Sequence, residues 1–268
     1  MSWDRQITLK NAKELAIMRE AGRINAEALA AARAIIRPGV TTADMNAAAE
    51  EVLKKYGVTS PFKNYPGPYP YPASTCISVN NELVHGIPSA RKLRAGDIVS
   101  MDCGTFYQGY VGDSAFTAGV GEISELAQRL LDATRDALMT GIAHLVVGNR
   151  VGDVSAAIQE CAESRGFHVT REYTGHGVGQ AMHEGPQLPN YGISGRGMAL
   201  KVGMTIAIEP MVLVGTPRTR VLADEWTVSS LDGSLTAHFE HTAAVTENGP
   251  LILTQLKDGL NPWDLSGQ

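Results

Sequence analysis

The chain has 268 residues, of which 44% are hydrophobic and 19% are charged, a balance typical of a globular protein with a sizeable core. Its formal net charge of −5 argues against a nucleic-acid groove or an anionic membrane surface as the main partner. No run approaches the roughly 20 apolar residues of a membrane span, and residues 1–6 contain no apolar signal core. We therefore expect a cytoplasmic protein. Its three cysteines, Cys76, Cys103 and Cys161, are too scattered for a disulfide framework or a zinc ribbon.

The first 60 residues predict two helices. Apolar residues recur at helical spacing over residues 13–36, and Pro38 and Gly39 end the run. Thr42 to Asp44 offers a cap for a second helix, which Gly57 stops after Tyr56.

The same helical pattern returns in the second half of the chain. A helix over residues 123–147 precedes another helix, which starts near Asp153 and closes at Gly166. Asp153 matches Asp44, and Gly166 matches Gly57, at one constant offset. Between them, the same offset also matches Ala47 to Ala156, Ala48 to Ala157 and Glu51 to Glu160. We interpret residues 1–268 as one domain with an internal pseudo-repeat, roughly 8–120 and 121–250. Chance similarity of Ala-rich helices is the alternative.

The remaining segments predict strands and loops. Residues 60–72 are dense in Pro, Gly and Tyr, and rigid loops of this kind often line pockets. Strands are predicted over residues 73–79, 98–102, 203–214 and 236–246. An Asp-Gly turn at residues 232–233 predicts that residues 226–231 form a hairpin with the last of these strands. Residues 261–268 read as a polar tail without an assigned role.

A hairpin over residues 101–117 brings two carboxylates together. If Gln108 and Gly109 form its turn, residue 102 pairs with 115 and residue 104 pairs with 113. Opposed residues share a face, so Asp102 and Asp113 become diagonal neighbours. Two like charges in a half-buried sheet either share a proton or hold a cation. Two unrelated aspartates on a solvated face are the alternative.

The histidines differ in their surroundings. His144 lies in a predicted helix and His168 at a strand start, so we expect both to be ordinary structural or surface residues. His176 lies between glycines, which let other groups approach closely and favour a ligand or a catalytic group. His183 follows seven residues later.

Two glutamates, Glu209 and Glu240, lie in strongly apolar strands. A buried carboxylate without a partner costs several kcal/mol, so each needs a cation or hydrogen-bond donors. Together with Asp102, Asp113 and His176 they supply four carboxylates and one imidazole, too much negative charge for one divalent ion. Two metal ions about 3.5–4 Å apart, bridged by carboxylates, are recurrent in aminopeptidases and phosphatases.

These residues stand in motifs by which the chain resembles the type I methionine aminopeptidases over nearly its whole length. The motifs are Cys76-Ile77-Ser78-Val79-Asn80, His85-Gly86-Ile87-Pro88, Asp102-Cys103-Gly104, Gly112-Asp113, Gly175-His176-Gly177-Val178-Gly179, His183-Glu184, Glu209-Pro210-Met211 and Phe239-Glu240-His241-Thr242. The resemblance implies a single catalytic domain with the pita-bread fold. This is an α/β (α+β) architecture of two pseudo-symmetric halves, with an antiparallel sheet covered by helices, around a dinuclear metal centre.

The resemblance also implies roles for individual residues. Two divalent ions, with Co, Mn, Fe or Zn as candidates, would be held by Asp102, Asp113, His176, Glu209 and Glu240, of which Asp113 and Glu240 bridge. The ions would activate a water and polarise the scissile carbonyl. Glu209 would also carry the proton of that water, His183 would hydrogen-bond the carbonyl oxygen and His85 would contact the scissile amide nitrogen. For each histidine, a structural hydrogen bond to backbone is the alternative.

The implied substrates are N-terminal Met-Xaa peptides of nascent chains with a small second residue. By resemblance, Cys76, Tyr71 and Trp226 line an apolar slot for the methionine side chain. We expect a monomer, with the ribosome exit region as a candidate contact and no direct nucleic-acid or membrane partner.

Two positions depart from the commonest bacterial pattern. Met182 stands where an aromatic residue often precedes the histidine, and this bears on the gate to the pocket. His238 stands where glutamine is frequent, and this bears on the hydrogen bonds around the metal.

Three other classes of protein share this fold. Xaa-Pro aminopeptidases and prolidases share all five ligands, but they usually carry an extra N-terminal domain, whereas this chain begins directly at the first helix. Type II methionine enzymes have a helical insertion, for which residues 183–209 leave no room. A non-catalytic peptide-binding protein is the third alternative, and such proteins typically lose ligands.

Overall fold

The computed structural model describes residues 7–264. Residues 1–6, noted above for the lack of a signal core, and residues 265–268, the end of the predicted polar tail, lie outside the described residues. The described helices are α1 (Ala12–Ala34), α2 (Thr42–Lys55), α3 (Glu125–Ala143) and α4 (Val151–Glu163). Among them, none is both long and apolar enough to cross a bilayer.

The strands form one large antiparallel sheet and two small ones. The large sheet has the order β1-β3-β4-β13-β8-β6-β7, with β14 beside β13. Its strands are β1 (Thr75–Val79), β3 (Ile98–Tyr107), β4 (Tyr110–Gly119), β6 (Thr174–Gly177), β7 (Glu184–Pro189), β8 (Thr205–Ile208), β13 (Glu240–Thr246) and β14 (Gly249–Ile252). The small sheets have the orders β10-β11-β2 and β12-β9-β5. Their strands are β2 (Glu82–Val84), β5 (His168–Val169), β9 (Met211–Leu213), β10 (Thr219–Val221), β11 (Val228–Ser230) and β12 (Thr236–His238).

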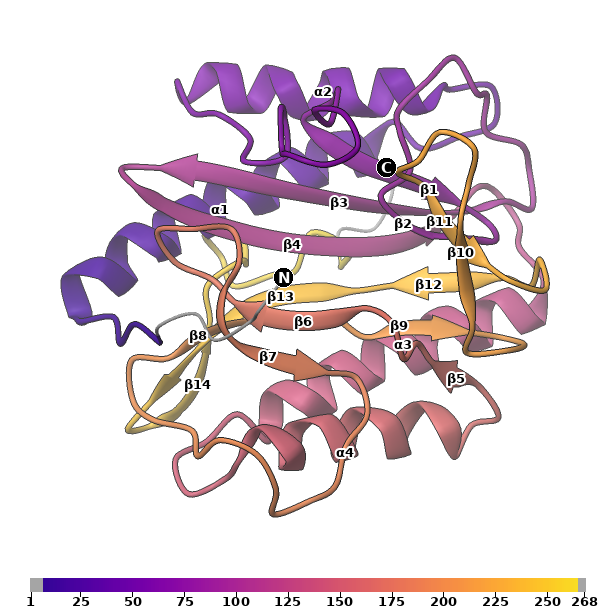
Figure 1. Cartoon of the computed structure of the whole chain (residues 1–268). Helices are drawn as coiled ribbons and strands as arrows, with labels where there is room; N and C mark the ends of the chain where they lie inside the picture. Colours follow the sequence, from indigo (N-terminus) through magenta and orange to yellow (C-terminus); the bar gives the residue numbers. More distant parts are fainter. Residues whose placement is uncertain (1–6, 265–268) are drawn as a thin grey trace.

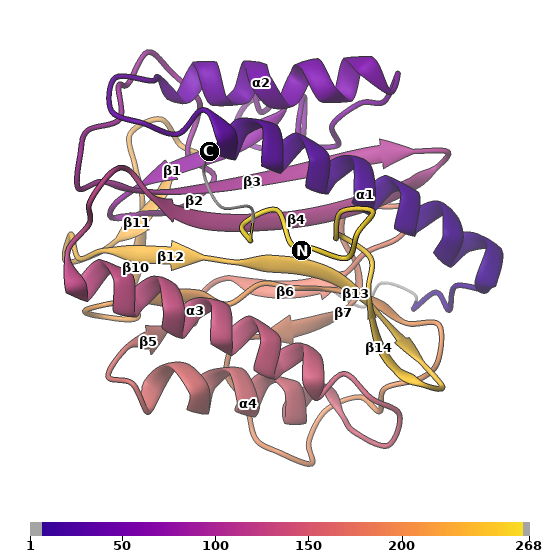
Figure 2. The same ribbon diagram turned by 180° about the vertical axis from the view of Figure 1, so that it is seen from behind.

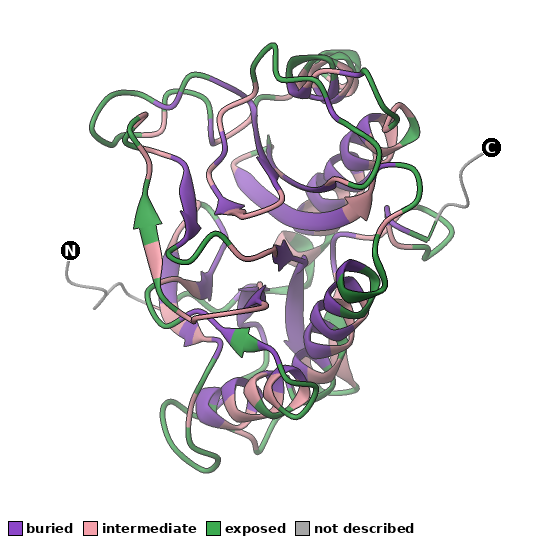
Figure 3. Cartoon of the chain, turned by 90° about the vertical axis from the view of Figure 1, so that its right-hand side faces the viewer, coloured by how far each residue is buried: buried purple, intermediate pink, exposed green. Residues whose placement is uncertain are grey.

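The helices lie on one side of the large sheet and leave its other side uncovered by helices (Figures 1 and 2). Helices α1 and α2 cover the strands of the first half of the chain, and α3 and α4 cover those of the second half. Buried residues gather on the strands and on the helix sides that face them, whereas the connecting loops are mostly exposed (Figure 3). The antiparallel α/β architecture is the predicted one.

The second helix of each half begins with the same local device. The carboxylates of Asp44 and Asp153 accept hydrogen bonds from the backbone N–H three residues earlier, at 2.9 and 2.7 Å. Such contacts satisfy free N–H groups at a helix start. Gly57 and Gly166 have φ angles of 64° and 83° just beyond the two helix ends, where a left-handed residue closes the last turn. The division into related halves within one catalytic domain remains a prediction.

Both long strands predicted for the second half are interrupted, which corrects the sequence analysis. The range 203–214 divides into β8 and β9 at Glu209 and Pro210, and the range 236–246 divides into β12 and β13 at Phe239. Proline has no N–H to continue the ladder. Strand β8 pairs with β13 in the large sheet, whereas β9 pairs with β12 in a small one. The two segments therefore leave the large sheet side by side.

The hairpin predicted from the turn at residues 232–233 is wrong. Strand β11 pairs with β10 and β2, whereas β12 pairs with β9 in another sheet. The turn itself is present, since Gly233 has a φ of 78° and Asp232 accepts a hydrogen bond from the N–H of Ser234 at 3.0 Å. The two strands that leave the turn diverge because each has its backbone partners elsewhere.

The described part of the predicted polar tail packs against the molecule. Trp263 is 9% exposed and lies edge-to-face with Phe239, with ring centroids 5.3 Å apart. The side-chain oxygen of Asn261 lies 2.9 Å from His241 Nε2. These residues thus cover the face of β13 that carries His241.

Candidate metal centre

The register of the first hairpin places its two aspartates on one face of the large sheet. Asp102 pairs with Ala115 and Gly104 pairs with Asp113, which confirms the predicted register. In the next strand, Glu240 pairs with Ala115. Because opposed and alternate residues share a face, Asp102, Asp113 and Glu240 project from the same side.

The second half of the sheet adds two more side chains to that face. His176 of β6 and Thr242 of β13 both pair with Ala207 of β8. Glu240 lies two residues before Thr242, and Glu209 lies two residues beyond Ala207. The alternation along extended chains therefore directs His176, Glu209 and Glu240 to one side.

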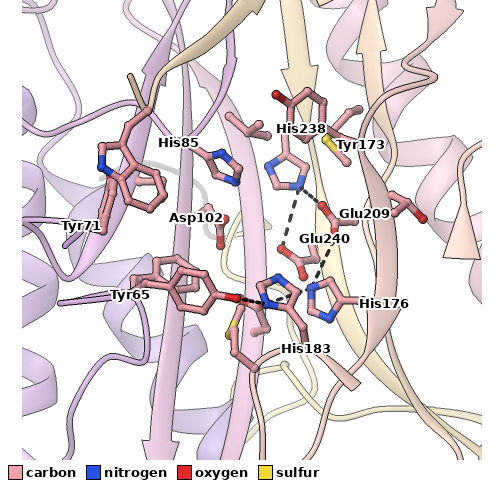
Figure 4. A pocket seen from close by; sticks show the side chains of 18 of the residues that line it. Tyr65, Tyr71, His85, Asp102, Tyr173, His176, His183, Glu209, His238 and Glu240 are labelled. Carbon is pink, nitrogen blue, oxygen red and sulfur yellow. Dashed lines mark hydrogen bonds and ion pairs between the residues drawn. The ribbon is translucent and has the colours of Figure 1, made fainter. Parts of the chain in front are cut away.

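All five side chains border one cavity, and Figure 4 shows Asp102, His176, Glu209 and Glu240 there. His176 Nε2 lies 3.8 Å from Asp113 Oδ2 and 3.4 Å from Glu209 Oε1. One ligand atom each from Asp113, His176 and Glu240 lie within 4.8 Å of one another, and all three residues are buried. Carboxylates with an imidazole form a donor set that divalent metals accept.

Several buried carboxylate oxygens lack a partner. Within residues 7–264, Asp102 Oδ1, Asp113 Oδ1 and Glu240 Oε1 have no hydrogen-bond partner. Burial, followed by repulsion from the neighbouring carboxylates, raises the pKa of Asp102, Glu209 and Glu240 well above the usual range, and burial raises the pKa of Asp113 to about 7. A cation would satisfy the free oxygens and favour the ionised carboxylates, so the residues present fit a metal.

Two further predicted histidines line the same cavity. The ring of His183 lies 4.3 Å from that of His176, and its Nδ1 lies 2.7 Å from the hydroxyl oxygen of Tyr65. His85 has a φ of 61°, an uncommon value for a residue with a side chain, and burial lowers its pKa to about 4. It is therefore neutral at pH 7. His144 and His168 are exposed, as predicted.

An apolar wall adjoins the acidic cluster. Both border one cavity of about 360 Å³, and Cys76, Tyr71 and Trp226 lie on its apolar side. The rings of Tyr71 and Trp226 meet edge-to-face at 5.1 Å, and the Tyr71 hydroxyl donates to the backbone oxygens of Thr75 and Gly86. All the predicted site residues border this cavity, namely Tyr71, Cys76, His85, Asp102, Asp113, His176, His183, Glu209, Trp226 and Glu240.

The cavity also contains residues that sequence reasoning did not place there. Phe62 and Tyr65 come from the loop 60–72, whose composition predicted a pocket-lining loop without indicating which side chains point inward. Tyr173 packs edge-to-face on His85 at 6.0 Å, and nothing in its sequence context pointed to this contact. Met182 and His238, noted above as departures from the family pattern, border the cavity as well.

Comparisons with known proteins agree with this geometry. Residues 16–247 match the model of metallopeptidase family M24. A methionine aminopeptidase of Clostridium acetobutylicum is 49% identical over 92% of this chain and 98% of its own length. The crystal structure of a methionine aminopeptidase from Thermotoga maritima superposes with a TM-score of 0.91, at 48% identity, over 93% of this chain and all of that one.

A more distant structure shares the fold. The prolidase from Pyrococcus furiosus is 25% identical, with a TM-score of 0.74, and the match covers 93% of this chain but 66% of the prolidase. The methionine aminopeptidases are thus more similar in sequence, in structure and in length. The chain belongs to metallopeptidase family M24 and, within it, to the methionine aminopeptidases.

Proposed function

We propose that this chain removes the N-terminal initiator methionine from nascent proteins and peptides whose second residue is small. The observation that carries the proposal is the meeting, in one cavity, of the four predicted carboxylate ligands, four imidazoles and an apolar slot. The carboxylates suit metal-assisted hydrolysis, and the slot suits an unbranched thioether side chain.

The metal centre would contain two divalent ions, Co, Mn, Fe or Zn, held by Asp102, Asp113, His176, Glu209 and Glu240. Four carboxylates carry more negative charge than one divalent ion neutralises, which supports two. When bound, such ions lower the pKa of a water and polarise a carbonyl. By the family resemblance, Asp113 and Glu240 would contact both ions; their donor atoms and that of His176 lie within 4.8 Å of one another.

The chain's own residues would move the protons and stabilise the developing charge. Glu209, which borders the cavity beside His176, accepts the proton of the attacking water and delivers it to the leaving amine. His183 donates a hydrogen bond to the carbonyl oxygen as negative charge develops, and Tyr65 holds its ring at Nδ1. His85, neutral and packed against Tyr173, contacts the scissile amide nitrogen.

The methionine side chain would occupy the slot beside Cys76, Tyr71 and Trp226. Burial raises the pKa of the Cys76 thiol, so this group stays protonated and packs as a small apolar side chain. We further propose a cytoplasmic monomer that acts on nascent chains near the ribosome exit region; three free cysteines support a reducing compartment.

A peptide panel tests this function. The protein is freed of metal with a chelator and reloaded separately with Co, Mn, Fe or Zn. Each preparation is then offered Met-Ala-Ser, Met-Lys-Ser and Ala-Pro-Ser. We expect methionine to be released from Met-Ala-Ser and not from Met-Lys-Ser, in a metal-dependent manner. Cleavage of Ala-Pro-Ser without a methionine requirement would instead indicate an Xaa-Pro peptidase. Binding of the peptides without cleavage in the presence of every metal would indicate a non-catalytic peptide-binding protein.

A further inference from the structure

His238 aims its imidazole into the acidic side of the cavity (Figure 4). Its Nε2 lies 3.6 Å from Glu209 Oε2 and 3.9 Å from Glu240 Oε2. Glu209 Oε1 lies 3.4 Å from His176 Nε2. The two oxygens of Glu209 therefore face one imidazole each.

The Nε2 atom of His238 is buried and has no hydrogen-bond partner among the described residues. The residue as a whole is 2% exposed. Both carboxylate contacts are longer than the 2.7–3.2 Å of a good N–H···O hydrogen bond. Because a buried nitrogen without a partner is unfavourable, its orientation toward the carboxylates calls for a ligand.

The backbone fixes this orientation. The Thr117 hydroxyl oxygen accepts a hydrogen bond from the N–H of His238 at 2.9 Å and donates to its carbonyl oxygen at 2.8 Å. His238 is the last residue of β12 and lies two residues before Glu240, the first residue of β13. The imidazole is thus held beside the carboxylates by a rigid strand end.

The spacing matches that of ligands around one ion. Two atoms that each lie about 2.1 Å from a metal are roughly 3.0–3.6 Å apart when the angle between them is 90–120°. The His176–Glu209 separation lies in this range, and the His238–Glu209 separation reaches its upper end. Small side-chain adjustments on metal binding would suffice for Glu240.

We propose that His238 is a metal ligand, which donates the Nε2 lone pair to an ion held between Glu209 and Glu240. The centre would then contain an imidazole on each side of Glu209. Imidazole suits Zn, Co and Fe better than Mn or Mg, so His238 should shift the preference of the site toward the former ions. This inference rests on the metal centre of the proposed function.

Proton NMR of the Co(II)-loaded protein tests it, because each coordinated imidazole gives a strongly shifted, exchangeable N–H resonance. We expect two such resonances in the wild type and one in His238→Gln, which keeps an amide near the carboxylates but removes the imidazole. The exposed His168→Gln serves as the matched control and should retain two. A single resonance in the wild type overturns the inference and leaves the metal centre intact, whereas failure to bind Co(II) at all refutes the centre itself.

Metal affinities give a second readout that needs no turnover. In competition with a chromophoric chelator, His238→Gln should lose affinity for Zn about tenfold more than for Mn. An equal loss for both metals would mean that His238 only positions Glu209, and the proposal would be wrong. Thermal unfolding of the metal-free variants checks that each one folds.

Discussion

His183 enters the cavity from the segment between β6 and β7 with the Tyr65 hydroxyl at its Nδ1. Its proposed hydrogen bond strengthens only when the carbonyl oxygen gains charge, so His183→Ala should affect the transition state more than the ground state. We expect kcat for Met-Ala-Ser to fall about 10²–10³-fold, as for other lost oxyanion donors, with little change in bound metal. Steady-state kinetics and elemental analysis of the same preparations measure the two effects.

His168→Ala is the control for this substitution, because His168 is exposed on β5, away from the cavity. It should leave both kcat and metal content unchanged. If His183→Ala lost metal in proportion to activity, His183 would belong to the metal centre and its assignment to the substrate carbonyl would be refuted.

At the level of single residues, the four carboxylates singled out from the sequence all border the cavity, whereas several of their neighbours there were not anticipated. Glu209 and Glu240 stood out because a carboxylate in an apolar strand requires compensation wherever the strand lies. His238 had no such signal, because a histidine in a strand is usually accommodated by hydrogen bonds. Its orientation depends on the strand break at Phe239, which is a tertiary feature.

A segment near the N-terminus is joined to the segment that carries His183 by a buried ion pair. Lys10 Nζ donates to Glu184 Oε2 at 2.5 Å, and the Thr8 hydroxyl donates to the same oxygen at 2.6 Å. The side chains of Lys10 and Glu184 are 4% and 10% exposed. Since Glu184 directly follows His183, this pair ties the position of His183 to residues 8–10.

The pair predicts a stability that depends on pH. Burial opposes ionisation of Glu184, but the hydrogen bonds from Lys10 and Thr8 outweigh it, and its pKa lies below the usual 4.5. A carboxyl with a lowered folded-state pKa stabilises the protein above its unfolded pKa, and this contribution is lost as pH falls through the folded value. Glu184→Gln should therefore lower the free energy of unfolding at pH 7 by about 1.5–3 kcal/mol and flatten its decline below pH 4.5.

Urea unfolding at several pH values measures this dependence. Glu163→Gln is the control, because Glu163, the last residue of α4, forms a more exposed ion pair with Arg171 and its loss should change stability by less than about 1 kcal/mol. An unchanged acid dependence in Glu184→Gln would show that the buried pair contributes no pH-dependent stability.

Among the elements, the helices were predictable and the strand breaks were not. Helical spacing and carboxylates that bond back to the helix start, such as Asp44 and Asp153, are local features, so they identify helices from the sequence. The glycines around His176 belong to β6, where they are needed because a Cβ on Gly175 or Gly177 would clash with the backbone of β8 or β7. Such close approaches depend on which strands become neighbours, and a single sequence does not specify that.

Across the whole molecule, the candidate metal centre lies at the junction of the two halves. Asp102 and Asp113 come from β3 and β4, whereas His176, Glu209 and Glu240 come from the second half, and β4 pairs with β13 at this junction. The Thr242 side chain exchanges hydrogen bonds with the backbone of Asp113 across it. The repeated helix pairs predicted two halves, but this pairing required the structure.

This location predicts that metal stabilises the entire fold. Without a cation, buried like charges oppose one another across the junction, and a ligand that binds only the folded state adds about 2.7 kcal/mol at a hundred times its Kd. For a chain of this size, that corresponds to a rise in Tm of roughly 5–10 °C. Differential scanning calorimetry of the metal-free protein, before and after addition of Co or Mn, should show this rise.

Asp113→Asn separates metal binding from general effects of ionic strength. The substitution preserves the shape of the side chain but removes a carboxyl group whose ionisation is disfavoured by burial. Without metal, the variant should therefore unfold at a higher temperature than the wild type. With metal the order should reverse, because the variant lacks one of the proposed metal ligands and gains little stability. Equal responses of both proteins to metal would place the ion elsewhere, and a chelated variant less stable than the wild type would mean that Asp113 is already compensated within the protein.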